Sequence, residues 1–135
     1  MNIGRFVAAA VGLWIVRVIL NATFYTQIVG RQFGEIASAH PGMFRTVVPA
    51  YIVTDLIFAV VFAFLFVKVG GALGGGAKAG VTLGVIIAIL SPVIGNLYEY
   101  YGVTYLPAGL AVGVSVFQVI AHAVEGAVAG VIYKS

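Results

Sequence analysis

The sequence has no cysteine and very few charged residues. Without cysteine, the chain has no disulfide, no thiolate nucleophile and no cysteine-ligated iron–sulfur cluster. Charged residues make up 8% of the 135 residues, against about 25% in an average soluble protein, whereas 62% of the residues are hydrophobic. This composition is that of an integral membrane protein, and we expect the lipid bilayer to surround it.

Sequence motifs for the common enzyme classes are also missing. No hydrolase, kinase, dinucleotide-binding or zinc-protease pattern is present, and the glycine-rich segment 70–76 lacks the Gly-Lys-Ser/Thr ending of a phosphate-binding loop. An enzyme would have to be built from membrane-embedded polar residues alone, and we do not expect one. The seven basic residues form no cluster, so we expect no nucleic-acid partner.

Four apolar runs are long enough to cross a bilayer at about 1.5 Å per helical residue. They cover residues 6–29, 46–67, 79–97 and 108–133. Pro92 lies inside the third run, where its missing backbone N–H should kink a helix. We therefore predict a single domain, 1–135, of the all-α membrane class: an up-down-up-down bundle of four transmembrane helices with the third kinked at Pro92.

The connections carry the signals for orientation. With four spans, both termini and the glycine-rich turn lie on one side, which holds four basic residues and no acid: Arg5, Lys68, Lys78 and Lys134. The other side holds two basic residues together with Glu35 and Glu99. Because cytoplasmic loops carry the excess of lysine and arginine, we expect both termini in the cytoplasm.

Small and aromatic residues suggest how the helices pack. The pairs Gly109/Gly113 and Gly126/Gly130 have the four-residue spacing that lets transmembrane backbones approach closely, within the chain or between copies. Four tyrosines lie between positions 98 and 105, in the expected connection before Pro107. We interpret them as an aromatic belt at the membrane interface, with sugar or pigment binding as the alternative.

The last apolar run contains a stripe of polar residues. Gln118, His122 and Glu125 fall on one face of a helix at roughly 100° per residue. An ionisable group in the interior of a bilayer costs on the order of 2.5–3.5 kcal/mol, so it needs a partner and is a candidate for function.

The other three runs supply partners at a similar depth. Arg17 and Asn21 lie one turn apart in the first run, Asp55 lies near the middle of the second, and Ser91 precedes the proline of the third. When depth is counted along each helix, Arg17, Asp55, Ser91, His122 and Glu125 form one layer, with Asn21 and Gln118 one turn away. We predict a polar core at the membrane midplane.

This layer has two interpretations. It is either a buried ion network that fixes helix register, with His122 as a hydrogen-bonded core residue, or a proton or cation site in which His122 and a carboxylate exchange ions. We expect no metal site, because a metal needs three or four ligands and the bundle holds only one histidine. His122 could serve as an axial ligand of a haem or chlorophyll, but a satisfied core histidine is the commoner case.

These features favour a small accessory or scaffold protein of the membrane. With little mass outside the bilayer, its recognition surfaces lie between helices, and we expect a homo-oligomer or a larger membrane complex. The alternative is a small proton- or cation-coupled transporter that uses the midplane layer. Quinone, pigment or lipid binding on the aromatic face of the second helix would fit either function, but the sequence identifies no cofactor.

Overall fold

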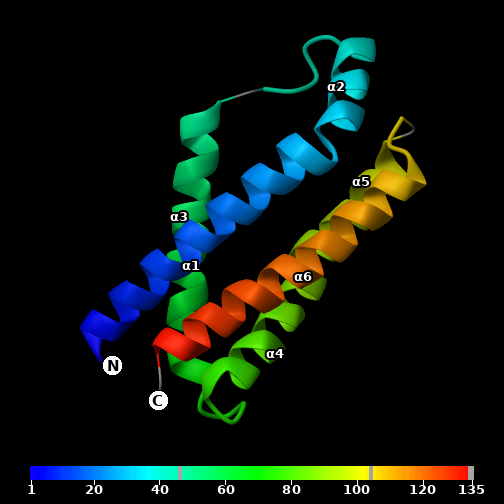
Figure 1. Ribbon diagram of the computed structural model, residues 1–135. Helices are drawn as coiled ribbons and strands as arrows, with labels where there is room; N and C mark the ends of the chain where they lie inside the picture. The colour runs from blue at the N-terminus through cyan, green and yellow to red at the C-terminus, as the bar shows by residue number, and fades with distance from the viewer. Residues whose placement is uncertain (46, 104, 134–135) are drawn as a thin grey trace.

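The computed structural model describes residues 1–45, 47–103 and 105–133, and throughout these it contains helices and connections without strands. Four helices are long and apolar enough to span a membrane: Ile3–Ile28, Val48–Val69, Gly76–Gly102 and Ala108–Ile132. Figure 1 shows them side by side, with the two chain ends at the same end of the bundle. The predicted all-α class with four transmembrane helices is confirmed.

The first span is followed by a helix that the sequence pattern did not predict. α1 (Ile3–Thr23) runs into the π-helical segment η1 (Phe24–Ile28), and α2 (Gly30–Ala39) follows where only a polar connection was expected. On α2, Arg31 donates a hydrogen bond of 2.9 Å to Glu35 one turn later, and this bond raises the pKa of the Arg31 guanidinium. Figure 1 shows α2 beyond the end of α1, at the end of the bundle away from the termini.

The second span, α3 (Val48–Val69), begins with a proline in its first turn, where a missing N–H costs nothing. Its expected start at Thr46 lies outside the described residues. After α3 the chain reverses through the glycine-rich segment, in which Gly74, Gly75 and Gly76 all have positive φ. Only glycine adopts such angles readily, so the segment forms a tight turn.

The third span contains the expected interruption at Pro92. It consists of α4 (Gly76–Ala88), the π-helical segment η2 (Ile89–Val93) and α5 (Ile94–Gly102), and Pro92 lies inside η2. The wider turn accommodates a residue that cannot donate the regular helical hydrogen bond. The helix ends at Gly102 rather than near residue 97, so three of the four tyrosines expected in a connection lie on α5.

The fourth span, α6 (Ala108–Ile132), is the most buried of the four. In an apolar stretch of 18 residues taken from each span, 39% of the residues of α6 are buried, against 17–22% in the other three. It packs most closely on α4, where glycines from both helices meet. A Cβ atom at Gly80 would overlap the backbone of Gly126, and one at Gly84 would overlap the backbone of His122. The two helices therefore touch through their backbones, as the Gly126/Gly130 spacing predicts.

The other predicted glycine pair has a different environment. A Cβ atom at Gly109 or at Gly113 would have no neighbouring atom within 4 Å among the described residues. These two glycines therefore form no packing face with the part of the chain that the structure describes.

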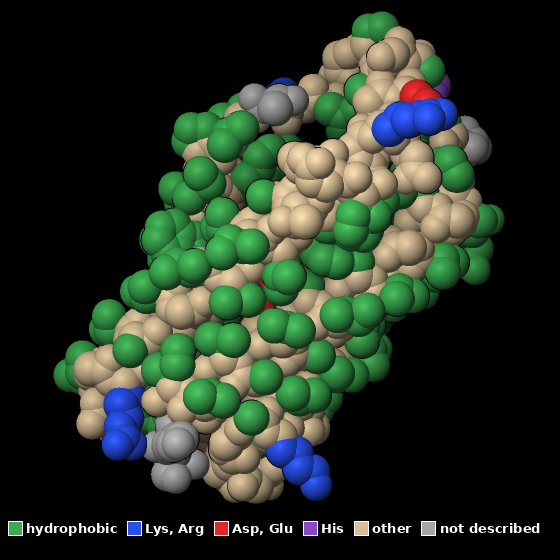
Figure 2. Space-filling view, in the orientation of Figure 1, with side chains coloured by type: hydrophobic (Ala, Val, Ile, Leu, Met, Phe, Trp, Pro, Cys, Tyr) green, Lys and Arg blue, Asp and Glu red, His purple; other side chains and the backbone are tan. Residues whose placement is uncertain are grey.

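The other helices pack against one another to different extents. α1 contacts both α3 and α6, whereas α3 has few contacts with α6. The central apolar cluster takes residues from all four spans: Leu13, Ala59, Phe62, Phe66, Ala79, Leu83 and Ala129. On the face drawn in Figure 2, apolar side chains cover the middle and lysine and arginine appear only towards the two ends. This distribution matches a protein whose middle lies in a bilayer.

Candidate functional site

Arg17 is the centre of the polar layer. It lies on α1, and its Nε donates a hydrogen bond of 2.7 Å to Oδ1 of Asp55 on α3. Its Nη1 lies 3.2 and 3.3 Å from the two carboxylate oxygens of Glu125 on α6. One guanidinium thus joins three helices, and it provides the main polar link between α3 and α6, which otherwise have few contacts.

The two carboxylates of this network have different surroundings. The side chain of Glu125 is fully buried, whereas that of Asp55 is 16% exposed and that of Arg17 is 14% exposed. Asn21, one turn along α1, donates a longer hydrogen bond of 3.4 Å to the same Asp55 oxygen. Glu125 is therefore closed inside the bundle, while the Arg17–Asp55 pair reaches its edge.

The aromatic ring of Phe58 contacts both Arg17 and His122. The Arg17 guanidinium carbon lies 3.8 Å from the centroid of the Phe58 ring, a distance at which cation and ring attract each other. The His122 ring meets Phe58 edge-on, with 5.1 Å between ring centroids. The sequence places Phe58 on the same helix face as Asp55, but it does not predict that the ring contacts both the guanidinium and the imidazole.

His122 has one satisfied and one unsatisfied ring nitrogen. Its Nδ1 lies 2.8 Å from the backbone carbonyl of Gln118, and because a carbonyl only accepts, Nδ1 carries the proton. Its Nε2 is buried and has no hydrogen-bond partner among the described residues, and the same holds for Oδ1 of Asn21. Such buried, unpaired atoms are uncommon in proteins and indicate either strain or a functional group.

The other predicted members do not join this network. The side chain of Gln118 donates a hydrogen bond of 3.2 Å to the hydroxyl of Tyr25 on η1. Ser91 is exposed in the π-helical segment, and no hydrogen bond connects it to the layer in the part of the chain that the structure describes. The connected site therefore consists of Arg17, Asn21, Asp55 and Glu125, with His122 reached through Phe58.

The site is open towards the first half of α3. Tyr51, one turn before Asp55 on the same helix face, is 61% exposed, and Val48 and Ile52 beside it are also exposed. The later residues of this face, Phe62 and Phe66, are buried. α3 thus packs along its second half, whereas in its first half these side chains are exposed and α1 reaches the backbone through Trp14, whose Nε1 donates a hydrogen bond of 3.1 Å to the carbonyl of Ile52.

The chemistry of the site is that of ion pairing and proton binding. Within the described residues, no three histidine, aspartate or glutamate side chains are placed to hold a metal ion.

Comparisons with models of protein families, with curated proteins and with solved structures give no match. The class that the fold defines is a four-span membrane protein in which a charged network joins three of the spans.

Proposed function

We propose that this protein is a small membrane scaffold or accessory subunit that packs against a second copy or a larger complex through the open inner face of α3. The observation that carries this proposal is the partial exposure of the Arg17–Asp55 pair in the middle of membrane-spanning helices. Charged groups facing lipid at this depth are costly, and a neighbouring helix would cover them.

The uneven packing of α3 supports the same proposal. Its first half has exposed side chains on the inner face, at Val48, Tyr51 and Ile52, as well as on the outer face. A partner helix seated there would bury apolar surface and could donate a hydrogen bond to Asp55. The intrachain role of Arg17 is then to hold α3 at an angle that leaves this face available.

The absence of cysteine makes a direct test straightforward. A single Tyr51→Cys variant carrying a photo-activated crosslinker in native membranes should give one discrete protein adduct. Val53→Cys is the matched control, because Val53 lies two residues away on the opposite face of α3 and is similarly exposed, at 55%. An adduct of two chains of 14.0 kDa would identify a homo-oligomer, and a larger one a heteromeric complex. Equal labelling of lipid from both positions, together with a monomeric mass in detergent, would overturn the proposal.

A second function, proton- or cation-coupled transport, is favoured by the charge balance of the site. One guanidinium faces two carboxylates, so the network carries one uncompensated negative charge when all three groups are ionised. A low-dielectric interior disfavours such a charge, and a bound proton or cation would neutralise it.

Transport is tested with Glu125→Gln, which keeps the shape and much of the hydrogen bonding but cannot exchange a proton. In liposomes with a pH gradient, a transporter should lose its proton flux in this variant while its oligomer mass stays unchanged. A scaffold should show no flux in either protein. Glu35→Gln, outside the membrane-spanning segments, is the control for a general effect of losing one acid.

A further inference from the structure

A hollow lies at the end of the bundle away from the termini, between α2 and the hairpin of α5 and α6. Its outer part has a volume of about 280 Å³, and its inner part about 80 Å³. Both parts are lined by Phe33, Glu99 and Leu106. The outer volume is close to the lower end of the range of about 300–1,000 Å³ for small-molecule sites.

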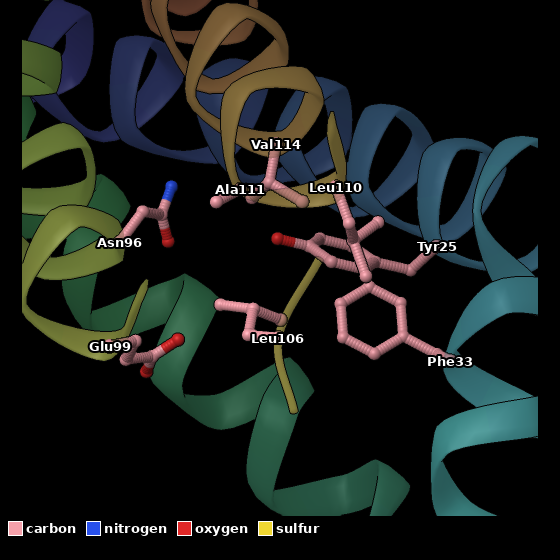
Figure 3. Close-up of a pocket in the computed structure, with 8 residues that line it drawn as sticks. All are labelled: Tyr25, Phe33, Asn96, Glu99, Leu106, Leu110, Ala111 and Val114. Carbon is pink, nitrogen blue, oxygen red and sulfur yellow. The ribbon is translucent and has the colours of Figure 1, made fainter. Parts of the chain in front are cut away.

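The walls combine aromatic rings with one carboxylate. Tyr25 and Phe33 lie next to each other on one side, with 5.8 Å between ring centroids, and Figure 3 shows Asn96 and Glu99 on the other side. Phe44 meets Phe33 edge-on at 6.1 Å, and Tyr105 also lines the outer part. Glu99 is the only charged side chain in either lining among the described residues.

The electrostatics of Glu99 favour a cation. It lies in the last turn of α5, where the free carbonyl groups of a helix end carry partial negative charge, so a carboxylate there is unfavourable by itself. Within the residues that the structure describes, no lysine, arginine or histidine forms an ion pair with it. The negative charge therefore remains available to a ligand.

We propose that this hollow binds a small organic ammonium group, of the kind carried by choline, either free or on the headgroup of a lipid. Quaternary ammonium is weakly hydrated and is recognised by aromatic faces together with a nearby carboxylate. A metal ion would require several oxygen ligands, which these apolar walls do not supply. The site is separate from the midplane network and does not depend on the scaffold function.

The two methionines of the chain allow a specific measurement. Met43 lines the outer hollow, whereas Met1 lies at the other end of the molecule. In protein labelled with ¹³C at the methionine methyl groups, in maltoside micelles, added choline should shift the Met43 resonance and leave that of Met1 unchanged. The neutral analogue 3,3-dimethylbutan-1-ol, which has the same shape without the charge, should bind about tenfold more weakly.

Two variants separate recognition from general charge effects. Glu99→Gln should weaken choline binding by about tenfold, and Glu35→Gln, which removes an acid outside the hollow, should change it less than about twofold. Equal loss in both variants, or equal binding of choline and its neutral analogue, would overturn the proposal.

A comparison of lipid discs identifies the source of the ammonium group. If the ligand is a lipid headgroup, discs of phosphatidylcholine should shift Met43 relative to discs of phosphatidylglycerol, and Glu99→Gln should remove the difference. If the ligand is free choline, adding choline to the protein in phosphatidylglycerol discs should shift the Met43 resonance as much as it does in maltoside micelles. No Met43 shift in any of these experiments would exclude an ammonium site.

Discussion

The guanidinium carbon of Arg17 lies 3.8 Å from the centre of the Phe58 ring. This contact places a flat apolar surface against a face of the guanidinium, whose faces form no hydrogen bonds, while the N–H groups at its edge reach Asp55 and Glu125. Phe58 also meets the His122 ring at 5.1 Å between ring centroids, in a T-shaped arrangement. The ring therefore contributes to the electrostatics of the site as well as to its packing.

Replacing Phe58 by leucine should weaken the site while preserving most of the apolar volume. We expect a loss of about 0.5–2 kcal/mol in the free energy of unfolding, because the cation–π contact is lost. The measurement is unfolding by sodium dodecyl sulfate in mixed micelles, followed by the fluorescence of the single tryptophan, Trp14. Phe64→Leu, on the exposed side of α3, is the comparison: its ring makes only a longer cation–π contact, 5.5 Å from Lys68, and we expect a smaller loss there.

Arg17→Leu should be the most damaging substitution in the polar layer. It leaves two carboxylates without their cation, and breaking a buried pair in this way costs about 3–5 kcal/mol. Adding Asp55→Asn should recover part of the loss, since one of the unpaired charges is removed. A double variant no more stable than Arg17→Leu would show that Asp55 contributes nothing to the pairing.

The exposed pair on α2 provides the matched comparison. Arg31→Leu breaks an ion pair of similar length, 2.9 Å, but both of its side chains are exposed. We expect a change of about 0.5 kcal/mol or less in unfolding free energy, because solvent-exposed pairs contribute little. A loss as large as that of Arg17→Leu would contradict the membrane placement of the Arg17 site.

The contact between α4 and α6 predicts opposite effects for two kinds of glycine. Gly84→Ala places a methyl group against the backbone of His122, so the helices must separate, and we expect a loss of about 1–3 kcal/mol or more. Gly113→Ala, with open space around it, should be neutral or slightly stabilising. The same unfolding measurement on both variants checks the prediction.

The orientation of the chain is predicted from its basic residues. Ala72→Cys, in the glycine-rich turn, and Ser38→Cys, on α2, replace residues at opposite ends of the bundle that are not buried. In intact cells an impermeant thiol reagent should label Ser38→Cys, and Ala72→Cys only after the membrane is opened. Labelling in the reverse order would mean that the termini lie outside the cytoplasm.

The sequence predicted the number of spans, because the length of each apolar run decides whether a helix can cross a bilayer. Counting along the helices also places Arg17, Asp55 and Glu125 at one level, and in the structure these three side chains meet. Ser91 does not join them, because the π-helical turn around Pro92 changes the direction of the side chains near it, and this cannot be deduced from a regular helix. The partners of Gln118 and Asn21 also depend on how the helices pack.

The glycine contact between α4 and α6 and the helix α2 could also have been predicted from patterns in the sequence. Gly76, Gly80 and Gly84 follow each other at the same four-residue spacing as Gly126 and Gly130; Gly76 and Gly80 meet Gly130 and Gly126, and Gly84 meets His122. α2 contains Arg31 and Glu35 at the spacing of a helical ion pair. The hollow near Glu99, in contrast, depends on segments far apart in the chain and could not be predicted from local patterns.

The π-helical turns η1 and η2 also have a consequence for chain length. Each holds about one residue more than a regular α-helical turn, and each adjoins the hollow, because Tyr25 lies in η1 and Asn96 lies just after η2. Deleting Thr26, which is exposed, would convert η1 into a regular turn without rotating α2 relative to α1. Deletions of one residue should therefore be tolerated at these two turns, and they would alter the width of the hollow while the helices keep the faces by which they pack.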